Sequence, residues 1–259
     1  MITLMNSSKT LNFERPARIS KHTIPEFLDD SKLLVARLQK LSVSDCSRLM
    51  GVSENLAILN VKRYQNWLTS PVGSEAKQAL LAFSGDIYAA MDTERYNIKD
   101  FNFAQKHLRI LSGLYGLLRP LDLIQPYRLE MATKLKTDRG QDLYRFWGTR
   151  INASLNEMLK REKSGVLVNL ASAEYFKAAK PKALRADVIT PVFKDYKDSS
   201  YRVVAIYAKK ARGLMCNYII QNRITRVEDL QAFKSDGYRF ARQLSSQSDW
   251  VFTRGDVTA

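Results

Sequence analysis

The feature that most constrains the fold is a change in hydrophobic pattern along the chain. Up to about residue 81 the apolar residues recur at helical spacing, whereas from Val166 onward they gather in short continuous runs. Helical spacing favours amphipathic helices, and short apolar runs favour buried strands. We therefore predict an α+β (mixed α/β) fold in which helices wrap a central mixed sheet. No linker divides the chain convincingly, so residues 1–259 are expected to form a single domain.

The pattern also places individual elements. A helical lobe is predicted at about residues 25–80, with helices over 24–41, 43–50 and 54–68 and helical structure continuing over 75–81. Ser42 is the candidate N-cap of the second of these helices. Further helices are predicted over 103–112, 142–163 and 209–223. Strands are predicted over 2–6, 166–170, 187–193, 201–207 and 250–253.

A large excess of basic residues is the second constraint. The chain has 41 Lys and Arg against 26 Asp and Glu, a formal charge of +15. Such an excess attracts polyanions, although solubility alone also accounts for it. Cys46 and Cys216 have no partner at CxxC spacing and are expected to be packed inside helices, in a reducing compartment. With no signal-peptide pattern and no apolar run of membrane-spanning length, we expect a soluble, cytoplasmic protein.

The segment 50–57, Met-Gly-Val-Ser-Glu-Asn-Leu-Ala, resembles the turn of a helix-hairpin-helix motif. A glycine at its second position permits a tight turn, and the amides that open the next helix would face a phosphate oxygen. A serine replaces the usual second glycine and a carboxylate follows it, so an ordinary helical hairpin is the alternative. The nucleic-acid-binding residues predicted here are Gly51, Ser53, Asn55, Lys62 and Arg63.

Two stretches without acidic residues follow in the C-terminal half, 176–186 and 201–221. Together they form one polyanion-binding face or, alternatively, two solvated helix faces that never meet. Their predicted nucleic-acid-binding residues are Lys177, Lys180, Lys209, Lys210 and Arg212. Gly213 lies inside the second stretch, where a glycine costs about 1 kcal/mol relative to alanine. Its presence predicts close approach of another element, such as a helix.

The sequence has no P-loop, no GxGxxG and no GxSxG motif, and its two histidines fit no metal-ligand spacing. We therefore predict neither a metal site nor a cofactor. Three polar segments are candidates for a site: 6–10, 119–130 and 169–176. Two of them follow predicted strands, where sites in α/β sheets tend to lie, although capping and turn chemistry is the alternative for each. Their candidate residues are Lys9, Thr10, Arg119, Tyr127, Arg128, Glu130, Asn169 and Ser172.

Several stretches resemble the peroxide stress resistance protein YaaA family: 8–11, 82–91, 103–131, 142–148, 168–178 and 207–215. The chain is identified from them as a member of that family. The resemblance implies a cytoplasmic protein that lowers the burden of unincorporated iron during hydrogen peroxide stress. It also implies a single-domain α/β fold with a helix-hairpin-helix element and a positively charged cleft suited to DNA. The family's Ser-Pro-Ala-Lys-Thr motif corresponds to residues 6–10, where only Lys9 and Thr10 match, and its Tyr-Thr-Gly is Tyr88-Ala89-Ala90 here.

Three hypotheses about function follow. The leading one is a monomer that binds double-stranded DNA and limits damage from unincorporated iron. The second is an enzyme, such as a glycosylase or lyase, that acts on DNA or a nucleotide with Lys9 as nucleophile. The third is an iron-handling protein, against which the lack of ligand spacing among the His and Cys residues argues.

Overall fold

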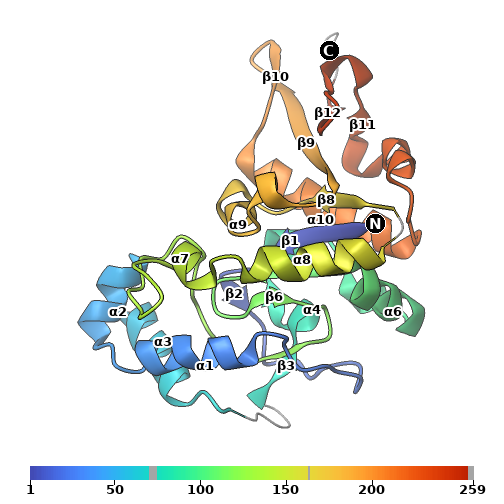
Figure 1. The fold of residues 1–259 in the computed structure, drawn as a ribbon. Helices are drawn as coiled ribbons and strands as arrows, with labels where there is room; N and C mark the ends of the chain where they lie inside the picture. The colour runs from blue at the N-terminus through green and yellow to red at the C-terminus, as the bar shows by residue number, and fades with distance from the viewer. Residues whose placement is uncertain (70–74, 163, 256–259) are drawn as a thin grey trace.

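Strand β1 (Ile2–Asn6) lies inside the main sheet of the computed structural model, which describes residues 1–69, 75–162 and 164–255 (Figure 1). It pairs in parallel with β5 (Leu108–Ser112) on one side and β8 (Val166–Asn169) on the other. Beyond β8, the strands β9 (Asp187–Lys197) and β12 (Asp249–Arg254) extend the parallel block. Antiparallel partners are β6 (Gly116–Leu118), β10 (Ser200–Arg202) and β11 (Arg239–Phe240). The predicted mixed α/β fold with a central sheet is confirmed.

Two short ladders lie outside this sheet. Strand β2 (Thr10–Leu11) pairs with β4 (Phe83–Ser84), and β3 (Lys77–Gln78) pairs with β7 (Leu123–Ile124). The α-helices are α1 (Leu28–Leu38), α2 (Val43–Met50), α3 (Glu54–Gln65), α4 (Ala79–Ala82), α5 (Asp86–Ala89), α6 (Ile98–His107), α7 (Leu143–Trp147), α8 (Arg150–Arg161), α9 (Ala173–Ala178) and α10 (Ala205–Gln221). Short 3-10 helices span Thr93–Arg95, Pro181–Ala183, Val227–Ala232, Ser235–Gly237 and Arg242–Leu244.

Helices flank both faces of the sheet, which is why β1 reads as a continuous apolar run. Figure 1 shows α8 in front of β1 and α10 behind it. Leu4 and Met5, neighbours on opposite faces of β1, are both fully buried. The two free cysteines are also buried, as predicted, and burial raises the pKa of the Cys216 thiol. In the described part of the chain, no helix combines the length and the apolar character that crossing a membrane requires.

The helical lobe contains α1, α2 and α3, and local signals in the sequence explain its ends. The Ser42 hydroxyl accepts a hydrogen bond from the Asp45 amide at 3.1 Å, which confirms the predicted N-cap of α2. Helix α2 ends at Gly51, whose φ of 60° is the left-handed conformation that glycine adopts freely. The buried Tyr64 of α3 donates its hydroxyl to the backbone carbonyl of Arg128. This bond fixes the lobe against the segment that follows β7.

Four sequence predictions need correction in their boundaries. The helix predicted over 24–41 is α1, which covers only Leu28–Leu38, and the one over 54–68 ends at Gln65. Residues 75–81 contain β3 and the start of α4 instead of continuous helix. Residues 103–112 are the end of α6 followed by β5. Here Ala104, Leu108 and Leu111 fit helical spacing, but pairing with β1 and β6 makes residues 108–112 a strand.

Two further elements differ because of residues that end them. The helix predicted over 142–163 is two helices, α7 and α8, separated at Gly148, whose φ is 54°; residue 163 lies outside the described residues. The strand predicted over 201–207 stops at Arg202, and α10 begins at Ala205. Tyr201 and Tyr207, at the two ends of this segment, are an even number of residues apart, as side chains on one face of a strand would be. Only Tyr201 lies in a strand.

Candidate nucleic-acid interface

A cleft of about 480 Å³ opens where β1 and β8 end. These strands are parallel neighbours, so the polar segments that follow them meet at one edge of the sheet. A third polar segment reaches the cleft through Glu130, while α10 and the segment 85–88 supply further walls. The cleft is lined by Asn6, Ser7, Ser8, Lys9, Thr10, Gly85, Asp86, Ile87, Tyr88, Glu130, Ser172, Glu174, Tyr175, Lys209 and Arg212.

Asparagine side chains hold the two strand ends together. Asn6 Oδ1 accepts a hydrogen bond from the backbone N–H of Ser172 at 2.9 Å, which ties the loop after β8 to β1. Asn169 Oδ1 accepts one from the backbone N–H of Ala171 at 3.1 Å. The Tyr88 hydroxyl donates to the Asn6 carbonyl at 2.9 Å. These bonds make one side of the cleft a fixed surface.

Lys9 is held by a carboxylate. Its Nζ lies 2.6 Å from Glu130 Oε2, and the other oxygen of Glu130 accepts from Arg128 Nη2 at 3.3 Å. Glu130 therefore bridges two cations. The Lys9 side chain is 59% exposed, so water and Glu130 both stabilise its ammonium ion. A lysine attacks only as the neutral amine, and this arrangement therefore suits anion binding better than nucleophilic attack.

Helix α10 contributes a pair of cations to the cleft lining. Lys209 and Arg212 are three residues apart, so they share a face of the helix, and both line the cleft. Burial lowers the pKa of the Arg212 guanidinium, and no carboxylate of the described residues lies within 4.0 Å of it. Lys210 is directed elsewhere, because its Nζ pairs with Asp236 at 3.2 Å.

The close approach predicted at Gly213 is confirmed, and its partner is α5. A Cβ added to Gly213 would lie 2.1 Å from the Ile87 carbonyl oxygen and 2.9 Å from the Ala90 Cβ. Only glycine allows the two helices to approach this closely. The contact sets the position of α10 against the segment 85–88, both of which line the cleft.

The lining carries charges of both signs. Asp86, Glu130 and Glu174 face the same cavity as Lys9, Lys209 and Arg212. Glu174 is already engaged, since its Oε1 accepts from the Ala132 amide at 3.1 Å. The lining alone is therefore not strongly basic, and an electrostatic attraction for a polyanion has to come also from cations around it.

Buried hydroxyls lie beneath the cleft. Ser7 Oγ donates to the Tyr175 hydroxyl at 3.4 Å, and the hydroxyls of Ser112 and Tyr127 are 2.6 Å apart. Burial raises the pKa of Tyr175 to about 12 and raises the pKa of Tyr127 as well. Both phenols therefore remain protonated at neutral pH and act as neutral hydrogen-bonding groups.

Two other predicted residues make contacts outside the lining. Arg119 pairs with the buried carboxylate of Asp122 at 2.9 Å and so belongs to the loop before β7. Lys177, on α9, holds its ammonium 4.6 Å from the centre of the Tyr144 ring. Lys180 precedes a 3-10 helix with a φ of 48°. The structure thus brings Lys9, Thr10, Glu130, Ser172, Lys209 and Arg212 together in the cleft lining.

The hairpin of α2 and α3 contacts the segment that carries Arg128, through the Tyr64 hydroxyl. Its turn residues Ser53 and Asn55 are exposed, and no side chain caps the first amides of α3. Arg63, in the last turn of α3, has its pKa lowered by burial, and the nearby Arg128 guanidinium lowers it further. Arg128 also pairs with Glu130, which in turn pairs with Lys9. That the hairpin grips a phosphate stays a prediction.

The segment 85–88 and two residues of α9 were not among the predicted site residues. Gly85 has a φ of 102°, and a Cβ there would lie 3.1 Å from Ser8 Oγ, so it permits the turn that brings Asp86 to the cleft. The Ser-Gly-Asp turn after an apolar pair is the signal in the sequence. For Glu174 and Tyr175, the signal is their place in the first turn of α9, the helix that follows β8. Among the described residues, no three His, Cys, Asp or Glu side chains gather as a metal-ligand group.

Classification follows from a comparison with protein families. Residues 1–244 match the model of a family described as peroxide stress protein YaaA. The chain belongs to this family. The family's association is with peroxide stress, as the resemblance implied. In this YaaA-family chain, the departures at Ser7 and Ser8 lie in the cleft lining itself.

Proposed function

We propose that this YaaA-family protein binds double-stranded DNA across the cleft and the α2–α3 hairpin, and thereby limits damage from unincorporated iron during peroxide stress. In this proposal it acts in the cytoplasm as a single-domain monomer. The observation that supports it best is that Lys9, Lys209 and Arg212, which come from separate parts of the chain, line one cleft. Arg128 adds a cation beside the cleft, because it pairs with Glu130, which also pairs with Lys9.

A phosphate backbone matches this arrangement. Lysine and arginine side chains bind phosphate oxygens without reading sequence, and free amides at a helix start add directional hydrogen bonds. The formal charge of +15 adds long-range attraction for any polyanion. We therefore expect binding that depends little on sequence and strongly on salt.

An enzyme acting on DNA or a nucleotide is the second candidate, and the mixed charge of the cleft favours it. Three carboxylates beside three cations give groups that can both bind a phosphate and transfer protons. The ion pair of Lys9 with Glu130 makes Lys9 a weak choice of nucleophile in this state.

The two candidates differ in whether the DNA is chemically changed after it is bound. Labelled duplexes of about 20 base pairs, either undamaged or with one oxidised base, are titrated with the protein. Fluorescence anisotropy measures the binding. The DNA is then recovered and analysed for products. Binding with intact DNA, retained in part by Lys9→Ala, supports the binding protein. Base or strand release that Lys9→Ala abolishes, or a product trapped by borohydride, supports the enzyme.

Glu130→Gln is expected to tighten duplex binding, because it removes a negative charge and frees both Lys9 and Arg128. One recovered phosphate contact is worth about 1 kcal/mol, or roughly fivefold in affinity. Fluorescence anisotropy at a fixed salt concentration measures the change in affinity. Glu157→Gln makes the same charge change on α8, outside the cleft lining, and should leave the affinity unchanged. Equal effects of the two variants would show that Glu130 does not restrain the cations.

A further inference from the structure

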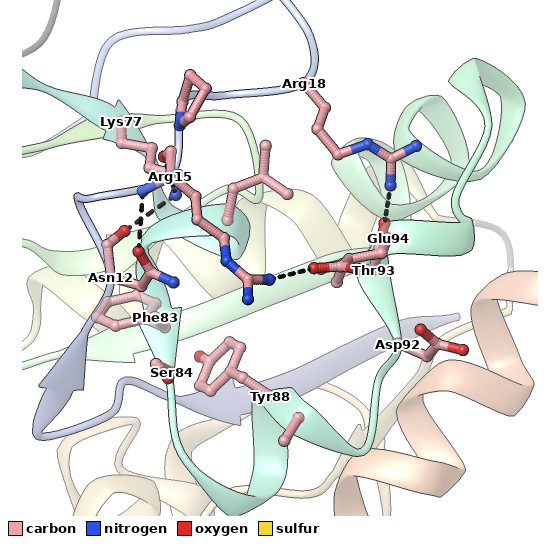
Figure 2. A pocket seen from close by; sticks show the side chains of 13 residues that line it. Asn12, Arg15, Arg18, Lys77, Phe83, Ser84, Tyr88, Asp92, Thr93 and Glu94 are labelled. Carbon is pink, nitrogen blue, oxygen red and sulfur yellow. Dashed lines mark hydrogen bonds and ion pairs between the residues drawn. The ribbon is translucent and has the colours of Figure 1, made fainter.

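A second cavity, of about 360 Å³, shares Tyr88 with the lining of the cleft. Figure 2 shows its residues, which come from the segment 12–18, from β3 and β4, and from the segment 88–94. Phe83 and Tyr88, each no more than 5% exposed, form part of its wall. Its volume falls at the lower end of the range for small-molecule sites.

Lys77 brings a buried positive charge to this cavity. The residue is 7% exposed, and its Nζ donates to the backbone carbonyls of Asn12 and Arg15, each at 2.9 Å. An ammonium has three donors, so two carbonyls leave one donor. Burial lowers the pKa of Lys77, and the Arg15 charge lowers it further. A buried cation held only by neutral carbonyls is stabilised by an incoming anion.

The carboxylates around the cavity do not provide that anion, because each already pairs with an arginine. Glu94 lies 2.6 Å from Arg15 Nη1, and Asp92 lies 2.8 Å from Arg95 Nε. Arg18 reaches only the backbone carbonyl of Thr93, at 3.5 Å. In the part of the chain that the structure describes, neither Lys77 nor Arg18 has a carboxylate within 4.0 Å. Lys77 and Arg18 are therefore available to an anion that enters the cavity.

We propose that this cavity is a binding site for a nucleoside monophosphate. Lys77 and Arg18 hold the phosphate, and the wall of Phe83 and Tyr88 takes the apolar face of the base. The side chains of Asn12 and Ser84, which also line the cavity, offer the hydrogen bonds that a base edge requires. The proposal does not rest on DNA binding in the cleft, with whose lining this cavity shares only Tyr88.

Isothermal titration of the full chain with the four ribonucleoside 5′-monophosphates tests the proposal. We expect at least one to bind, and its parent nucleoside and inorganic phosphate to bind at least tenfold more weakly. Binding of none of them, or binding of phosphate alone as tightly as the nucleotide, overturns the assignment.

Variants locate the site. Arg18→Ala, at an exposed position that the fold does not need, should weaken nucleotide binding at least tenfold, and Lys77→Met should do the same if circular dichroism shows it folded. Lys21→Ala removes a cation from the same loop but outside the cavity lining, and should bind as the wild type does. Equal loss in Arg18→Ala and Lys21→Ala contradicts the proposal. The cleft variant Lys9→Ala/Lys209→Ala/Arg212→Ala should still bind nucleotide, whether or not the chain binds DNA.

Discussion

The variant Lys9→Ala/Lys209→Ala/Arg212→Ala should bind duplex DNA about 100-fold more weakly than the wild type at 0.1 M salt. The three side chains line one cleft, so we expect a phosphate backbone in it to contact all of them. Each charged hydrogen bond to phosphate contributes about 1 kcal/mol or more, and three together give the expected loss. Anisotropy titration of a labelled duplex measures it.

A control with the same change in net charge separates cleft contacts from general attraction. Lys160, Lys210 and Lys234 lie outside the cleft lining, and Lys210 even shares α10 with two of the cleft cations. Replacing these three by alanine should weaken binding only a few-fold, since exposed charges that do not line the cleft contribute only an attraction that salt screens. If the control variant loses as much affinity as the cleft variant, the cleft is not where DNA binds.

Gly213→Val should be the most destabilising single substitution at the cleft. Its Cβ would lie 2.1 Å from the Ile87 carbonyl, which is backbone and cannot turn away. Helix α10 then has to move off α5, at a cost of about 3 kcal/mol, the upper end of the usual range for overpacking. Urea denaturation followed by circular dichroism measures the free energy of unfolding. Because α10 and α5 both line the cleft, the movement should also weaken DNA binding.

Gln221→Val is the control for this substitution. It places the same β-branched residue on the exposed last turn of α10, where only helix propensity changes, by less than about 1 kcal/mol. Equal stability of Gly213→Val and Gln221→Val would show that the contact between α5 and α10 relaxes freely.

Local signals in the sequence were enough for part of the fold. The apolar runs of β1 and β8 and the Ser42 cap of α2 each reflect chemistry within a few residues, and each was predicted. The glycine inside α10 predicted a close approach, but the sequence did not give its partner, α5. The strand after α6 and the end of β10 were not predicted. Their state depends on pairing partners distant in the chain, such as β1 for Leu108–Ser112, and periodicity within one segment cannot show that partner.

The candidate site, too, could be predicted from the sequence only in part. The sequence showed that polar residues follow the strands, including Lys9 and Ser172. It did not show that these residues lie close together, because that depends on β1 and β8 being parallel neighbours. The pairing of Lys9 with Glu130 and the departure of Lys210 toward Asp236 depend on side-chain direction, which spacing does not give. The cavity around Lys77 was missed because its walls come from four separate segments.

Salt dependence tests the binding surface most directly. For a protein whose cations displace counterions from duplex DNA, the logarithm of the binding constant falls linearly with the logarithm of salt concentration, by roughly 0.9 for each phosphate neutralised. We expect a steep slope for the wild type and a slope about two to three units shallower for the Lys9, Lys209 and Arg212 variant. A wild type that does not bind duplex, or a slope that the three alanines leave unchanged, would contradict a DNA-binding cleft.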